Sequence, residues 1–560
     1  MSEGGPPAGA TGLGRVLRSL PRAVWFGLVL AFLAILLPWN SLLDWSASRF
    51  NTVRGFYTDY ARGIAWLRLA LGANAALLVA WPGLLRLLWP PVSSPLARPH
   101  DRRDGEIMAG LFIVALVLRL VGVTRSLQHD EWYIATQYVQ HGPLVIATRF
   151  TGYTNHVFYT LMAWVTTKLF GLNEFGLRVP AVLFGALASP ILYGALRCRF
   201  ARSWSLTGAL ALCFSAFAIE YAQEARAYSV TLFGVAALMW LFEELRDRPT
   251  RGALFGVVAV STALVYTRIF NVLIVVAFVV AAGVNAMARK ESGLALLRRS
   301  FLAAMTAAFL SFALYAITFG TFLDVLKSGR PEPGELQGYV SADILLPGEL
   351  SVAFLPRGFM LAVWALSILG LIALYPRHGF WFFLLSITAS LTVWRAGLPW
   401  DSSRFLMHLL PLLMTSQVAA IAWMAERGAW GRRSALMLAG ALVCAQAASS
   451  VRYYQQRKLD FKAEAAFLAA QPGNGKVGYA HDSKTITWYF RPAERCVEVN
   501  EKTIDAEDPE WVSVHTATLA GEGRFANRIY RRYEQAWQQK TMYGRSLTLW
   551  HRTGPPPREK

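Results

Sequence analysis

The feature that most constrains this chain is a succession of apolar runs, many of them about twenty residues long, separated by short polar segments. A run of that length crosses the hydrocarbon layer of a membrane as one helix, in which the backbone polar groups find partners inside the helix. The chain is 55% hydrophobic, with a mean hydropathy of +0.36, which excludes an ordinary soluble protein. We predict about thirteen spans, at 23–43, 65–88, 107–123, 176–196, 203–219, 229–243, 253–266, 271–288, 301–323, 358–375, 380–394, 405–424 and 434–450.

Basic residues assign the loops to the two sides of the membrane, because cytoplasmic loops carry an excess of Lys and Arg. One apolar stretch, 157–170, is short, and counting it as a span would break that bias for the later loops. We therefore predict that it is a helix resting on the outer face. The N-terminus is then cytoplasmic, and the C-terminal tail lies outside. Most of the formal net charge of +20 thus reflects topology and does not indicate nucleic-acid binding.

Four regions follow from this pattern. They are a disordered cytoplasmic N-terminus at 1–22, two additional spans within 23–103, a transmembrane core at 104–450 that includes the outer loop 125–175, and an outer α/β domain at 451–560. We expect this last domain to cover or shape an outward-facing site. Its pattern predicts helices at 460–470 and 524–539, and strands at 476–480, 485–490, 497–499, 511–515 and 546–550.

Charged side chains gather at the outer ends of the predicted spans, where they are costly unless they are paired or used. Asp130 and Glu131 come just after the span 107–123, and further polar segments lie at 153–156 and 220–228. Taken singly, each arginine is explained equally well by contact with lipid headgroups. Together, carboxylates and arginines on one face predict a site for an anionic lipid-linked substrate, because the planar guanidinium binds phosphate with two hydrogen bonds.

The order of four motifs resembles that of the bacterial GT-C glycosyltransferases, in the subgroup of the protein O-mannosyltransferases and the lipid A aminoarabinose transferases. The motifs are Asp130-Glu131, Asn-His-Val-Phe-Tyr at 155–159, Leu-Phe-Gly-Leu-Asn-Glu-Phe-Gly-Leu-Arg-Val-Pro at 169–180, and Tyr-Ala-Gln-Glu-Ala-Arg-Ala-Tyr at 221–228. The resemblance implies a polytopic helical fold with periplasmic juxtamembrane helices. It also implies that a sugar passes from a polyprenyl-phosphate donor to a hydroxyl of a lipid, an envelope glycan or a protein. The reaction would take place on the periplasmic face of a bacterial inner membrane.

The resemblance matches Asp130 and Glu131 to the family's first acidic motif. Attack by a hydroxyl needs a general base, and neighbouring residues in a helix point about 100° apart. We therefore assign the base to Asp130 and a supporting hydrogen bond to Glu131. The donor phosphate is assigned to Arg226, Arg404 and Arg268, in that order of preference. The further substrate-binding candidates are Asn155, His156, Tyr159, Glu224 and Tyr228.

Two departures from the family pattern bear on chemistry. The second acidic motif has Glu224 where relatives often have Asp, and the chain has no Asp-x-Asp. We therefore expect no cofactor and a mechanism without a divalent metal. Asn155-His156 stands where many relatives have His-Pro-Pro or Lys-Pro, so the acceptor is expected to differ.

A transporter or flippase of lipid-linked sugars is the alternative from another functional class. It would also need spans, arginines and buried carboxylates, but it typically has inverted repeats and broken spans with its site at mid-membrane. No such repeat is evident in the sequence, and the polar candidates gather on one face. A non-catalytic scaffold is a third reading, which leaves this outer cluster unexplained.

Overall fold

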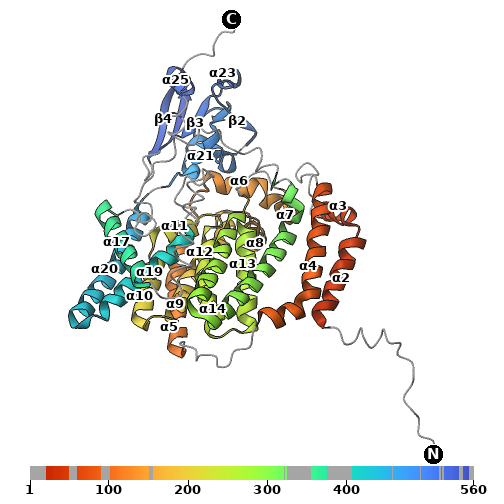
Figure 1. Cartoon of the computed structure of the whole chain (residues 1–560). Coiled ribbons are helices and arrows are strands. Elements are labelled where there is room, and N and C mark those ends of the chain that lie inside the picture. The colour runs from red at the N-terminus through yellow and green to blue at the C-terminus, as the bar shows by residue number, and fades with distance from the viewer. Residues whose placement is uncertain are drawn as a thin grey trace, which may run out of the picture.

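The protein is a bundle of helices with a small α/β domain on one end, as the computed structural model shows in Figure 1. The structure describes residues 21–49, 60–89, 101–149, 155–320, 322–323, 355–374, 407–456, 458–491, 493–515, 519, 523–540 and 546–553. The predicted N-terminal segment 1–22, except for its last two residues, and the predicted span 380–394 lie outside these residues.

Three helices stand at one side of the bundle in Figure 1: α2 (Arg22–Leu36), α3 (Trp39–Arg49) and α4 (Tyr60–Leu88). Pro38 lies between α2 and α3 and has no N–H to donate to a helical turn, so the run 23–43 is interrupted instead of forming one helix. The α4 helix docks on the core, where the Asn74 amide donates to the Phe309 carbonyl at 2.8 Å.

The core is built around α9 (Glu174–Arg197), which packs against helices on several sides. Small residues allow this close approach: a Cβ on Gly194 would lie 2.5 Å from the Trp240 ring. The other core helices are α5 (Arg102–Leu120), α10 (Arg202–Cys213), α11 (Ala216–Ala222), α12 (Tyr228–Asp247), α13 (Arg251–Thr267), α14 (Val272–Tyr315), α17 (Arg357–Leu374), α19 (Leu410–Ala425) and α20 (Gly428–Gln455).

Within the described residues, seven helices are long and apolar enough to cross a membrane, or up to eight if one bent pair forms a single span. That pair is α10 and α11, whose axes differ by 52°. The chain is therefore a multi-pass membrane protein, but the predicted number of about thirteen spans is not confirmed. Shorter helices account for part of the difference, including α2, α13 and the described part of α17.

Two predicted spans, 271–288 and 301–323, belong to one stretch of helical backbone, α14. Together with the 3-10 turns at its two ends, α14 makes two span-length parts, Ile269–Met287 and Gly293–Thr318. A Cβ on Gly293 would lie 2.4 Å from the Asn285 carbonyl oxygen, so the two parts approach closely near their junction.

The arginine-rich ends of the core helices meet at one end of the bundle. The buried Asp104 carboxylate accepts hydrogen bonds from Tyr193, Arg197 and Arg202, which join α5, α9 and α10. Arg199 pairs with Glu243 on α12. These partners stabilise charges that would otherwise be costly near a membrane.

The segment 125–175 carries short helices at the opposite end of the core: α6 (His129–Gln137), the 3-10 turn η2 (Val139–His141), α7 (Pro143–Thr148) and α8 (Val157–Phe170). The α8 helix has 14 residues, which is short for a span, and it packs on α7, α9 and α13. Gly171, with φ of +85°, ends it in the left-handed region that glycine favours, and the chain turns into α9.

The C-terminal domain contains a five-stranded sheet in the order β2-β1-β3-β5-β4. The strand β1 pairs in parallel with β2 and β3, whereas β5 is antiparallel to β3 and β4. Its helices are α21 (Phe461–Ala469), α22 (Ile486–Tyr489), α23 (Ile504–Glu507) and α25 (Gly523–Arg532), and its strands are β1 (Val477–Tyr479), β2 (Cys496–Glu498), β3 (Trp511–His515), β4 (Tyr533–Lys540) and β5 (Ser546–Arg552).

Two predictions for this domain are wrong. The segment 485–490, predicted as a strand from its aromatic and β-branched residues, forms the short helix α22. The helix predicted at 524–539 ends at Arg532, and the rest of it becomes β4. Pairing with β5 overrides the helix propensity of the Glu, Gln and Ala residues in that strand.

One carboxylate of the domain is buried in an unfavourable place. Glu464 on α21 is fully buried, and neither oxygen has a hydrogen-bond partner among the described residues. Burial raises the pKa of Glu464 to about 8, although the nearby Ser513 opposes the shift. The unfolded chain ionises near pH 4.5, so the domain loses stability as pH rises from there to about 8.

We predict that Glu464→Gln stabilises this domain at pH 7 by about 2–3 kcal/mol, because the amide cannot ionise. The measurement is protection of the α21 amides from hydrogen exchange in the full-length protein, compared with wild type at pH 5 and pH 7. The exposed Glu494→Gln is the control. Equal protection of Glu464→Gln and wild type at pH 7 would contradict the prediction.

Candidate active site

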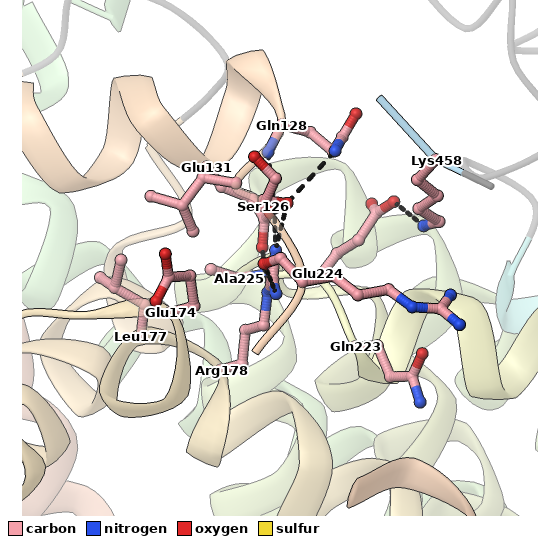
Figure 2. Close-up of polar contacts among 12 residues, drawn as sticks. Ser126, Gln128, Glu131, Glu174, Leu177, Arg178, Gln223, Glu224, Ala225 and Lys458 are labelled. Atoms are coloured by element: carbon pink, nitrogen blue, oxygen red, sulfur yellow. Dashed lines mark hydrogen bonds and ion pairs between the residues drawn. The ribbon is translucent and has the colours of Figure 1, made fainter. Parts of the chain in front are cut away.

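The centre of the candidate site is a buried ion pair between Glu131 and Arg178 (Figure 2). The Arg178 Nε and Nη2 donate to the two Glu131 carboxylate oxygens at 2.7 and 2.6 Å. Glu131 is 1% exposed and also accepts from the backbone N–H of Ala225 and of Gln128. Its oxygens thus tie α6, α9 and the loop after α11 together.

Arg178 lies near the start of α9, and its remaining N–H groups fix the chain that leaves α5. They donate to the carbonyl oxygens of Val123, Arg125 and Ser126 at 2.8, 2.6 and 3.1 Å. A guanidinium has five N–H donors, and this one uses all of them on protein groups. Arg178 therefore holds the acidic segment in place and has no donor left for a ligand in this arrangement.

Asp130 points to a different partner from its neighbour. An Arg226 Nη1 lies 2.8 Å from an Asp130 carboxylate oxygen. The Arg226 side chain is 4% exposed, whereas that of Asp130 is 28% exposed. The structure thus brings together the predicted base and the preferred phosphate-binding arginine, with the carboxylate accessible.

The next predicted residues gather round Tyr228. The guanidinium carbons of Arg226 and Arg268 lie 5.6 and 5.4 Å from its ring centroid, which is within cation–π range. The His156 ring meets Tyr228 edge-on at 6.0 Å, and its Nδ1 accepts from the Ala227 N–H at 3.3 Å. The structure therefore brings together Arg226 and Arg268, which come from separate loops.

Two predicted substrate-binding residues make structural contacts. The buried Asn155 amide donates to the carbonyl of Ile146 at 2.9 Å, and the Tyr159 hydroxyl donates to the carbonyl of Leu177 at 2.8 Å. A third, Glu224, pairs with Lys458 at 2.8 Å, and Figure 2 shows the two side chains facing each other. Arg404, which was predicted to bind the donor phosphate, lies outside the described residues.

A polar pocket lies between the bundle and the segment that leads to the C-terminal domain. Its lining combines basic and acidic groups with amides: Arg125, Gln128, Glu131, Arg178, Gln223, Glu224, Tyr453 and Lys458 are among them. A larger pocket, lined mostly by apolar residues, lies beside Arg199 and Glu243 at the other end of the bundle. Within the described part of the chain, no three His, Cys, Asp or Glu side chains are placed to hold a metal ion.

Sequence reasoning missed the roles of Arg178 and Lys458. An available signal for Arg178 was its place within the first turns of an apolar run, where a charge needs a partner. Lys458 gave no such signal, because it stands in a polar segment and its partners are 234 and more residues away.

Comparison with known families decides the class of the protein. Residues 156–317 match the family described as dolichyl-phosphate-mannose-protein mannosyltransferase. The chain is a membrane glycosyltransferase. The matched segment holds His156, Arg178, Arg226 and Arg268, and it begins after the acidic pair. A search of curated proteins found no match to this chain.

Solved structures of two other glycosyltransferases are similar in part. The Archaeoglobus fulgidus oligosaccharyltransferase, solved with zinc and sulfate, is 10% identical, with 78% of this chain and 72% of that chain covered and a TM-score of 0.48. ArnT from Cupriavidus metallidurans in the apo state is 13% identical, with 80% and 98% covered and a TM-score of 0.31. The same ArnT bound to undecaprenyl phosphate is 14% identical, with 79% and 97% covered and a TM-score of 0.31.

Proposed function

We propose that this glycosyltransferase moves a sugar from a polyprenyl-phosphate donor to an acceptor hydroxyl on the periplasmic face of a bacterial inner membrane. The observation that carries the proposal is the contact between the accessible Asp130 carboxylate and the buried Arg226 guanidinium. The matched family, whose description names a lipid-phosphate sugar donor and a protein acceptor, supports the class of donor. The acceptor is a lipid, an envelope glycan or a protein.

The chemistry needs a proton acceptor and a charge that stabilises the leaving group. The acceptor oxygen bonds to the anomeric carbon, the bond from that carbon to the phosphate oxygen breaks, and the hydroxyl proton passes to Asp130. The polyprenyl phosphate leaves as an anion, which needs no protonating acid if arginines bind it. Arg226, with Arg268 on the same tyrosine ring and Arg404, fills that role in this proposal. No step requires a metal or another cofactor.

The remaining residues position these groups. Glu131 holds Arg178 and the loop backbone, which keeps its neighbour Asp130 in place in the first turn of α6. Tyr228 lies beside Arg226 and Arg268, and His156 packs against Tyr228. Asn155 and Tyr159 fix the segment that carries His156. Glu224 pairs with Lys458 and so fixes the loop 223–227 that carries Arg226.

Turnover of the donor tests the function. The purified protein, in vesicles, would be given undecaprenyl phosphate carrying different single sugars, together with envelope lipid and glycan acceptors. We expect release of free undecaprenyl phosphate with one of these donors, and retention of the sugar on an acceptor. Movement of the intact donor across the bilayer without release would instead identify a flippase.

The proposed orientation makes its own prediction. In a cysteine-free background, single cysteines at the exposed positions Thr124 and Lys502 should react with a membrane-impermeant thiol reagent from outside. Cysteines at the exposed Ser203 and Arg432 should react only after the membrane is opened. Labelling of Ser203→Cys from outside would mean that α8 crosses the membrane.

We also predict that Arg226→Lys weakens binding of undecaprenyl phosphate about tenfold, which equals about 1.4 kcal/mol. The ammonium keeps the positive charge and loses the two-pronged contact with phosphate oxygens. Arg452→Lys, at an exposed position at the end of α20, is the matched control and should bind as wild type does. Unchanged affinity of Arg226→Lys and Arg226→Ala would show that the phosphate binds elsewhere.

A further inference from the structure

The segment after α20 inserts a lysine into the core of the protein. The Lys458 Nζ lies 3.1 Å from a Glu220 carboxylate oxygen and 2.8 Å from one of Glu224. All three side chains are largely buried. Burial alone would lower the pKa of Lys458, and the two carboxylates reverse that effect and raise it above its ordinary value. The lysine is thus held as a cation between two carboxylates from the α11 region.

Glu220 lies on α11, just before the loop 223–227, and Glu224 lies within that loop. The loop joins α11 to α12 and carries Arg226. At its start, the Gln223 side chain donates to the Val121 carbonyl and accepts from the Tyr453 hydroxyl at 2.8 Å. In its middle, the Ala225 N–H donates to Glu131 at 2.6 Å. Lys458 pairs with Glu224, which lies between the anchors Gln223 and Ala225. Arg226 is the next residue after Ala225.

The positive charge of Lys458 reduces the repulsion between two buried carboxylates. Glu220 and Glu224 both face its ammonium, and without it two buried carboxylates would repel each other across the base of the loop. Relief of that repulsion would move Glu224 outward. Arg226 is two residues further on, so its contact with Asp130 would be displaced.

The same C-terminal segment also holds the acidic side of the site. The Leu127 N–H donates to the Tyr489 hydroxyl at 2.7 Å, and the Gln128 side-chain amide donates to the Leu459 carbonyl at 3.2 Å. The Lys484 Nζ lies 5.1 Å from the centroid of the Trp132 ring. Residues before and after Asp130 are therefore fixed by residues 459–489.

We propose that Lys458 is a positioning residue for the donor-phosphate site: it neutralises Glu220 and Glu224 and so keeps Arg226 against Asp130. The region after α20 is then part of the donor site and not only a cover. This inference rests on the proposed function, because it takes Arg226 as a phosphate ligand.

The test is binding of undecaprenyl phosphate to the full-length protein in detergent, which requires neither the sugar nor the acceptor to be known. Lys458→Met should weaken binding at least tenfold, since one partner of a buried charge cluster is removed. Lys458→Arg should recover most of the affinity, because the cation is kept. Lys458→Met combined with Glu220→Gln should also recover part of it, because the net charge of the cluster returns to its original value.

The matched control is Lys462→Met. Lys462 also joins the C-terminal region to the bundle, through Glu174 at 3.0 Å, but it does not contact the loop 223–227. It should bind as wild type does. An equal loss in Lys462→Met would mean that docking alone matters and would overturn the positioning role, as would a lack of recovery in both rescue variants.

The two proposals fail in different ways. If wild type binds undecaprenyl phosphate and Arg226→Ala does not, normal binding by Lys458→Met overturns only the role of Lys458. If wild type fails to bind undecaprenyl phosphate, both the proposed donor and this inference are wrong.

Discussion

Asp130→Asn should reduce donor turnover by roughly 10²–10⁴-fold while leaving binding of undecaprenyl phosphate largely intact. Asparagine keeps the shape of the side chain and can still accept a hydrogen bond from Arg226, but it cannot take the proton of the attacking hydroxyl. The Asp130 side chain is 28% exposed, so its substitution changes the surroundings of only one buried group, the Arg226 guanidinium.

The comparison that isolates chemistry is between release of undecaprenyl phosphate and its binding, measured on the same folded preparation. Asp101→Asn, at the N-cap of α5 and at the opposite end of the bundle from Asp130, provides a carboxylate control that should retain full turnover. Near-normal turnover in Asp130→Asn would falsify the assignment of the base to this residue.

Substitution of Glu131, the neighbour of Asp130, should lower the stability of the protein. Glu131→Gln removes the charge that neutralises the buried Arg178, and we expect a loss of about 3–5 kcal/mol in the free energy of unfolding. Arg178→Met should cost a similar amount, because it leaves a buried carboxylate and frees three backbone carbonyls of their donor.

A double-mutant cycle makes this quantitative. Glu131→Gln combined with Arg178→Met should destabilise the protein by less than the sum of the two single variants, since the double variant leaves no unpaired buried charge at this pair. Reversible unfolding in detergent, followed by tryptophan fluorescence, provides the free energies. If Glu131→Gln is as stable as wild type and yet fails to turn over the donor, then Glu131 takes part in the chemistry and the roles of the two carboxylates are exchanged.

Several features could be predicted from local sequence. Apolar runs located most of the core helices, because burial in a membrane leaves a plain signal of length and hydropathy. The 100° between adjacent helical residues predicted that Asp130 and Glu131 would face different surroundings, and they contact Arg226 and Arg178 respectively. Arg226 and Arg268, both assigned to one phosphate site from the sequence, lie over the same Tyr228 ring.

Other features depend on partners that are distant in sequence. The exchange of helix for strand after Arg532 comes from pairing with β5, which local propensity does not contain. The partnership of Lys458 with Glu220 and Glu224 likewise appears only when the chain is folded. The break at Pro38 was visible in the sequence, but a hydropathy window averages across a single proline.

The contacts of Leu127 and Gln128 with residues 362 and 331 positions later set an order of events during synthesis. A ribosome that adds about 5–20 residues per second makes the acidic segment on the order of 20–70 s before the residues that hold it. During that interval the nascent chain already exposes Asp130 but lacks the hydroxyl of Tyr489 and the ammonium of Lys458. If Lys458 and Tyr489 hold the site as we propose, a chain truncated after α20 should insert into the membrane but fail to turn over donor, because competence then depends on folding of the C-terminal domain.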